Sequence, residues 1–128
     1  MERDVINNSD LHFEHKQWTR ELLFWKDELK SLQNRLNELV LRWTEETILA
    51  QLEHYQNQFV IQENEINELE DFINMHETNI SEHFKKGEDV LDLQLVKKHI
   101  EFRNQIDTLR NLYSELKGNF FRFLSKYM

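Results

Sequence analysis

The sequence contains no cysteine and no proline, and only two glycines in 128 residues. Without cysteine there is no disulfide framework, no thiolate chemistry and no iron–sulfur cluster. Without proline and with little glycine, the chain has few of the residues that make tight turns. Long helices therefore suit this chain better than sheets or disorder, and its many Leu, Glu, Gln, Asn and Lys residues agree with that expectation.

Positive charge is scarce relative to negative charge. Sixteen Lys and Arg stand against 24 Asp and Glu, which gives a net charge of −8 and a pI near 5.2. Nucleic acid and anionic membranes are both bound through a basic face. The pairs Lys85–Lys86 and Lys97–Lys98 are too short to make one, so we expect neither kind of partner.

Long apolar runs are absent as well. No stretch approaches the length that spans a bilayer. Residues 1–10 are polar and lack the apolar region of an export signal. On these grounds we expect a cytoplasmic protein.

What the sequence does contain is a heptad pattern. Apolar residues recur at alternating spacings of four and three, which is typical of helices that pack in a coiled-coil-like bundle. The first seam is Leu11, His15, Trp18, Leu22, Trp25, Leu29, Leu32, Leu36, Leu39 and Trp43. The second is Ile48, Leu52, Tyr55, Phe59, Gln62, Ile66, Leu69, Ile73, His76, Ile80 and His83. The third is Leu95, His99, Phe102, Ile106, Leu109, Tyr113, Leu116, Phe120, Phe123 and Tyr127.

Two breaks separate these seams. The phase slips between Trp43 and Ile48, which predicts a turn near 43–47, although a continuous helix is the alternative because no glycine or proline marks it. The second break is at Gly87, which can end one helix, and Asp89 can cap the next. We therefore predict an all-α fold of three long antiparallel helices, at about 10–43, 47–85 and 89–126, in an up-down-up bundle. Residues 10–128 would form a single domain after a flexible tail, 1–9.

Short connections also predict the register between neighbouring helices. Residues at one level of an antiparallel pair have numbers with a constant sum, so the two turns place seam positions opposite seam positions. Two of the resulting levels are polar. Gln62 and Tyr113 share a level with Leu29, where the amide can bond the phenol and fix the register. The other polar level brings together His15, His76 and His99.

Three inward imidazoles offer three nitrogens to one ion and leave a fourth position open, as in catalytic zinc sites. Copper, iron and nickel also accept imidazole. Against a metal site, none of the three histidines has an acidic residue three or four positions away on its own helix to orient it. The competing interpretation, which the lack of such an acidic residue favours, is a plain polar layer that is sensitive to pH.

The other histidines are weaker candidates. His12 can join His15 at a spacing of three, and His83 faces Asp92, where an ion pair near the turn is the more ordinary interpretation. Motifs of known helical metal proteins do not fit, since no histidine follows a glutamate by three residues, as ferritin-like bundles require. The acidic run from Glu63 to Asp71 spreads over the outer face of a helix and is interpreted as solvated surface.

The sequence contains no glycine-rich phosphate loop and no serine elbow, so we do not expect an enzyme. Apolar residues off the seams indicate a face for self-association or for another helical protein: Leu23, Phe24, Val60, Ile61, Leu93, Ile100 and Phe121, with Val96 beside two of them. The leading hypothesis is a non-enzymatic interaction protein that forms a homo-oligomer. The alternative is a zinc-binding bundle, with metal-dependent hydrolysis as a minor variant.

Overall fold

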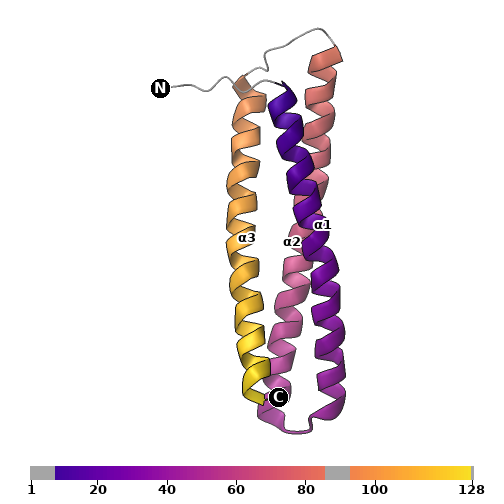
Figure 1. Ribbon diagram of the computed structural model, residues 1–128, viewed down its shortest axis with the longest axis vertical. Coiled ribbons are helices and arrows are strands. Elements are labelled where there is room, and N and C mark those ends of the chain that lie inside the picture. The colour runs from indigo at the N-terminus through magenta and orange to yellow at the C-terminus, as the bar shows by residue number, and fades with distance from the viewer. Residues whose placement is uncertain (1–7, 86–92, 128) are drawn as a thin grey trace.

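The structure, a computed structural model, describes residues 8–85 and 93–127, apart from the side chains of 8, 9, 83–85 and 93. The described residues form three helices and no strand: α1 (Asn8–Arg42), α2 (Glu46–Lys85) and α3 (Leu93–Tyr127). In Figure 1, α1 and α3 run in one direction and α2 runs in the other. The predicted three-helix bundle is thus confirmed. No helix in the described part of the chain has an apolar stretch long enough to cross a membrane.

Helix boundaries differ from the prediction by a few residues. Helix α1 begins two residues earlier than expected, at Asn8, and α3 ends one residue later, at Tyr127. Residues 43–45 are not helical, so the phase slip does mark a turn and the alternative of a continuous helix is wrong. Two backbone hydrogen bonds flank this turn, from Trp43 N to Leu39 O at 3.1 Å and from Leu49 N to Glu45 O at 3.0 Å. The predicted turn at Gly87 and the cap at Asp89 lie outside the described residues.

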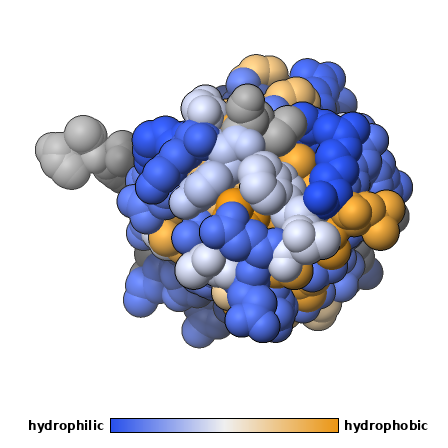
Figure 2. All heavy atoms as spheres, turned by 90° about the horizontal axis from the view of Figure 1, so that it is seen from below, coloured by the Kyte–Doolittle hydropathy of each residue, from blue (hydrophilic) through white to orange (hydrophobic). Residues whose placement is uncertain are grey.

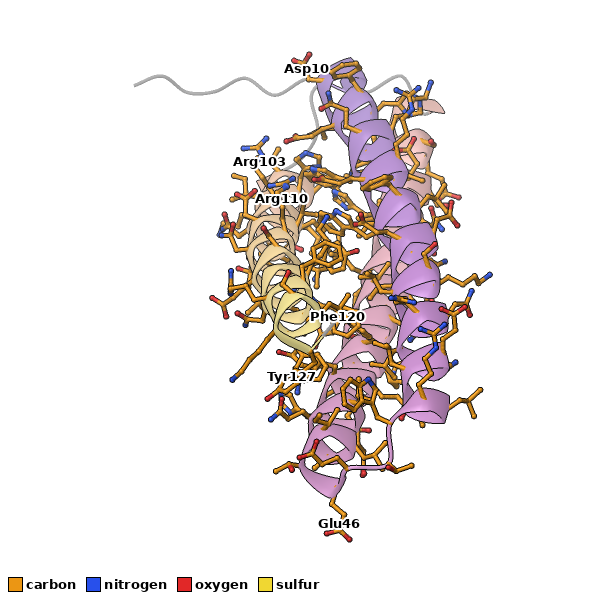
Figure 3. All side chains as sticks on the ribbon, turned by 60° about the horizontal axis from the view of Figure 1, so that its bottom comes forward. Asp10, Glu46, Arg103, Arg110, Phe120 and Tyr127 are labelled. Carbon is orange, nitrogen blue, oxygen red and sulfur yellow. The ribbon has the colours of Figure 1, made fainter. Side chains whose placement is uncertain are left out.

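The seams form the core because heptad spacing keeps one stripe of each helix turned toward its neighbours. Aromatic rings fill the end near the α1–α2 turn, where Phe59 and Phe120 meet edge to face with centroids 5.0 Å apart. Phe120 projects from α3 into the space between the helices (Figure 3). Seen along its axis, the bundle shows a largely hydrophilic surface with separate apolar patches (Figure 2).

The predicted bond across the Gln62–Tyr113 level does not form. The hydroxyl of Tyr113 instead donates to Glu28 Oε1 at 2.6 Å, and the same carboxylate receives Lys117 Nζ at 3.0 Å. A charged acceptor at the edge of the seam makes a stronger hydrogen bond than a neutral amide, which explains the preference of the phenol.

Helices α1 and α3 are connected by a ladder of ion pairs. Its members are 89 residues apart and repeat every seven residues: Glu14–Arg103, Glu21–Arg110 and Glu28–Lys117. Figure 3 labels the first two arginines of α3, Arg103 and Arg110, which lie about two helical turns apart. Each exposed pair contributes little free energy by itself. Their common spacing shows that α1 and α3 are parallel and in a single register.

Candidate metal centre

Three histidines, one from each helix, lie together inside the bundle. His15, His76 and His99 are 3%, 3% and 0% exposed. Their ring centroids are 5.1 Å apart for His15–His76, 5.0 Å for His15–His99 and 5.7 Å for His76–His99. The predicted histidine cluster is therefore present: the three helices bring these positions to one level, as the constant-sum argument expects.

The histidine layer separates two apolar clusters. Leu11 and Ile80 pack on the side of the helix ends, and they are joined there by partly buried Leu95 and Val96. Trp18 begins the main core on the other side, and its ring stacks on His99 at 4.8 Å between centroids. Apolar walls on both sides lower the local polarity, which strengthens any electrostatic interaction made within the layer.

Two carboxylates orient two of the histidines. Glu77 Oε1 accepts a hydrogen bond from Nδ1 of His15 at 2.5 Å, and Glu14 Oε1 accepts one from Nε2 of His99 at 2.7 Å. Arg103 holds Glu14 in turn through two bonds of 2.9 Å. Metal-binding histidines characteristically donate their outer nitrogen to a carboxylate in this manner.

The spacing of acidic residues along each histidine's own helix does not indicate these carboxylates, because both belong to other helices. Each carboxylate reaches a histidine of a neighbouring helix: Glu14 is on α1 and bonds α3, and Glu77 is on α2 and bonds α1. A residue beside a seam position lies at the edge of the interface, where it can reach across. The signal was therefore present in the dipeptides Glu14–His15 and His76–Glu77.

The orientation of the carboxylates fixes which nitrogens face inward. An ionised carboxylate only accepts, so the proton of neutral His15 is on Nδ1 and that of neutral His99 is on Nε2. The remaining nitrogens, Nε2 of His15 and Nδ1 of His99, are 3.2 Å apart. Both then present lone pairs, with no hydrogen between them. Nε2 of His76 is also buried and has no hydrogen-bond partner.

These three inward atoms have spacings close to those of a metal site. One nitrogen from each ring can be chosen so that all three lie within 4.8 Å of one another. A tetrahedral zinc ion with bonds of about 2.0–2.1 Å separates its ligand atoms by about 3.3 Å. The His15–His99 pair already has that separation, at 3.2 Å. The other separations, which are at most 4.8 Å, have to shorten by no more than about 1.5 Å to complete the set.

Burial keeps the histidines neutral, as metal ligands must be. It lowers the pKa of His76 to about 4, and His15 and His99 act in the same direction. Burial also lowers the pKa of His15 and of His99, and it outweighs the opposing pull of Glu77 and Glu14. Burial raises the pKa of Glu14 itself, but hydrogen bonds from Arg103 and His99 bring it below its usual value.

The remaining candidates lie outside the triad. His12 is half-exposed, and its Nδ1 donates to Glu77 Oε2 at 2.6 Å, so it helps to position the carboxylate that bonds His15. The predicted pairing of His83 with Asp92 lies outside the described residues, since they include neither the side chain of His83 nor Asp92.

Surface hollows reach the layer from two sides. One of about 350 Å³ includes His15 and Glu77, and another of about 410 Å³ includes His76.

Comparison of the chain with protein-family models, curated proteins and solved structures finds no match. The function of the site is therefore inferred from its own geometry.

Proposed function

We propose that the protein binds one divalent transition-metal ion, with zinc preferred, through His15, His76 and His99. The observation that carries the proposal is the pair of inward lone pairs on His15 and His99, which face each other at 3.2 Å because Glu77 and Glu14 hold the protons outside. Two facing acceptors repel. A metal cation placed between the two nitrogens would accept both lone pairs and remove the repulsion.

The chemistry of the ligand set favours zinc. Zinc accepts nitrogen ligands in a tetrahedral arrangement and has no geometric preference arising from d-electrons. Three protein nitrogens leave a fourth position for water, and surface hollows lie beside His15 and His76. Copper and nickel also bind imidazole, so the choice of ion rests partly on what the cell supplies. The proposal is for binding and includes no catalytic step.

Elemental analysis of tag-free protein tests this proposal. We expect about one equivalent of zinc in the wild type, taking one ion per three-histidine site. We expect a large loss in His76→Ala, with the helical circular dichroism retained. His54→Ala is the matched control, because His54 is exposed and lies about 33 Å away along α2 at 1.5 Å per residue. No stoichiometric metal in the wild type, or equal metal in His76→Ala, would overturn the proposal.

A second candidate function is the one that the sequence suggested first, a non-catalytic interaction protein of the cytoplasm that self-associates. The supporting observation is a set of exposed apolar side chains that a monomer leaves in water, among them Phe24 at 60% exposure, Leu112 at 54% and Ile61 at 51%. Val96 does not belong to this set because it packs beside Leu11 and Ile80. Sedimentation over a range of concentrations tests self-association, and cell fractionation tests the location.

A further inference from the structure

Charge is distributed very unevenly among the three helices. Helix α2 has nine Asp and Glu and a single basic residue, Lys85, at its last position. Helix α3 has three acidic residues and seven basic ones, and α1 has six of each. Most of the net charge of −8 therefore comes from one helix.

The ion pairs between helices leave one interface open. Helix α1 is bonded to α2 through Lys26–Glu70 and to α3 through the ladder that begins at Glu14–Arg103. Between α2 and α3, in the part of the chain that the structure describes, the hydrogen bonds made by side chains amount to a single link, from Tyr55 Oη to Asn119 O at 3.3 Å. Among the described residues, the carboxylates of α2 along this interface therefore form no ion pair with a Lys or Arg of α3.

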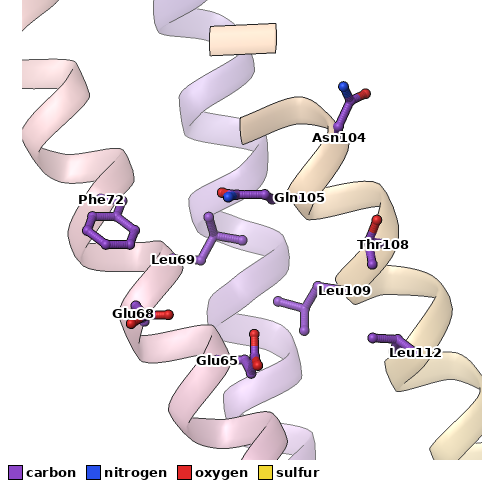
Figure 4. Close-up of a pocket in the computed structure, with 9 residues that line it drawn as sticks. All are labelled: Glu65, Glu68, Leu69, Phe72, Asn104, Gln105, Thr108, Leu109 and Leu112. Atoms are coloured by element: carbon purple, nitrogen blue, oxygen red, sulfur yellow. The ribbon is translucent and has the colours of Figure 1, made fainter. Parts of the chain in front are cut away.

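A groove runs along the open interface (Figure 4). Leu69 of α2 and Leu109 of α3 form its floor and point toward each other. Phe72 and Leu112 line its sides at 45% and 54% exposure. The hollow between them has a volume of about 280 Å³. An apolar floor with exposed apolar sides is the kind of surface that receives the apolar face of a helix.

The groove continues toward the α1–α2 turn. A second hollow of about 320 Å³ shares Glu65 and Leu112 with the first and adds Ile61 and Glu115. Glu68 stands beside Glu65 on the α2 side. Neither the first hollow nor the second is lined by a Lys or Arg. The two hollows therefore form one groove that is apolar around Leu69, Leu109 and Leu112 and has acidic edges.

We infer that the α2–α3 groove binds a basic amphipathic helix of a partner protein. This inference rests on the interaction role of the second candidate function, but it assigns the groove to another protein rather than to a second copy, and it is independent of the metal. Leucine-like anchors at the i, i+3, i+4 and i+7 positions of the partner would fill the groove, and its Lys or Arg residues would meet Glu65, Glu68 and Glu115. Ile61 and Phe72 are about 16 Å apart along α2, so the occupant needs about three helical turns.

A second copy of the chain fits the groove less well. Each copy carries a charge of −8, so two copies repel at long range, whereas a basic helix is attracted. On the α3 side, the first hollow is lined by the neutral side chains of Asn104, Gln105 and Thr108. Among the basic residues of α3, Arg103, Arg110 and Lys117 are already paired with α1.

The test uses two labelled synthetic helices. In the first, leucines occupy the amphipathic spacing and the other positions are Lys and Ala. In the second, Glu replaces every Lys. Fluorescence anisotropy measures the dissociation constant of each peptide for the wild type, and amide shifts in NMR spectra locate the bound peptide. We expect the basic peptide to bind at least about tenfold more tightly than the acidic one, a difference of about 1.4 kcal/mol, with shifts concentrated along the groove.

Variants separate the groove from general attraction to an acidic protein. Leu112→Lys is expected to weaken binding of the basic peptide about tenfold, and Ile61→Lys serves if the first variant loses its helical signal. The matched control is Leu41→Lys, because Leu41 is 88% exposed on α1 and the new charge is the same. Equal binding by Leu112→Lys and Leu41→Lys, or equal binding of the two peptides, overturns the inference.

Sedimentation of the protein without peptide distinguishes the remaining outcomes. A dimer that forms in the wild type and Leu41→Lys but is lost in Leu112→Lys assigns the groove to a second copy. That result overturns the inference and retains the interaction function. If the protein neither binds the basic peptide nor self-associates, the inference and the interaction function are both rejected.

Discussion

Nε2 of His15 and Nδ1 of His99 face each other at 3.2 Å, while the opposite nitrogen of each ring donates to a carboxylate. Because Glu77 and Glu14 accept those bonds, the inner atoms of the neutral rings both present lone pairs. A buried layer that served only to fix the register would place a proton between these two atoms. Glu77 and Glu14 instead favour protons on the outer nitrogens of the two rings.

The first prediction concerns the two carboxylates. Glu77→Gln and Glu14→Gln remove the acceptors that fix the tautomers of His15 and His99, and such losses typically lower metal affinity about 10- to 100-fold. Competition with a chromophoric zinc chelator measures the change. Asp27→Asn is the control. Asp27 is exposed on α1, and its substitution removes one negative charge, as each Gln variant does. Unchanged affinity in both Gln variants would show that the carboxylates do not support a metal.

The second prediction concerns pH and the stability of the metal-free protein. Burial lowers the pKa of His76 to about 4 in the folded state, against about 6.5 in the unfolded chain. Between these values the unfolded chain binds more protons, so stability falls as the pH drops from 6.5 toward 4. The full loss is about 3 kcal/mol at 1.36 kcal/mol per pKa unit.

Urea unfolding measures this loss when it is carried out with a chelator at several pH values, over a range of ~2.5 units below pH 7. His76 shares its surroundings with His15 and His99, with Glu77 beside it and with Lys98 of α3. His76→Leu should therefore lose less stability over the same range, although not zero, because burial also lowers the pKa of the other two histidines. Parallel curves for the wild type and the variant would contradict the assignment.

The third prediction uses Trp18 as a reporter. Its ring lies 4.8 Å from that of His99 and 5.4 Å from that of His15, measured between centroids. A paramagnetic ion such as Co²⁺ bound by the triad should quench the emission of Trp18, and excess Zn²⁺ should restore it. Trp18→Phe should lose most of the effect, whereas Trp43→Phe, in the turn after the far end of α1, should keep it. Equal quenching in these two variants would place the ion elsewhere.

The fourth prediction tests the link between α1 and α3. Tyr113→Phe removes the hydroxyl that donates to Glu28 at 2.6 Å. Hydrogen bonds to charged groups contribute about 1.5–3 kcal/mol. We expect a loss near the lower limit, because Lys117 still neutralises the carboxylate. The thermal unfolding midpoint of Tyr113→Phe, compared with that of the control variant Tyr127→Phe, measures this loss of stability. Equal midpoints would indicate that the bond contributes nothing.

The sequence by itself determined the three helices and the level of the three histidines. Heptad seams specify which face of each helix is buried, and the phase slip after Trp43 places the first turn. Once the turns are placed, an antiparallel register has no remaining freedom except a shift by a whole heptad. That is why the sequence alone assigns His15, His76 and His99 to one level.

Only the tertiary structure decided how the layer is bonded. Glu14 and Glu77 reach histidines of other helices, and the distance across an interface depends on the rotation and spacing of both helices, which a pattern along one helix does not contain. The same reason explains why Tyr113 bonds Glu28 rather than Gln62. No turn joins α1 directly to α3, so their ladder of ion pairs also emerged only from packing. The side of each ring that carries the proton, on which the proposed metal centre depends, follows from these contacts between helices.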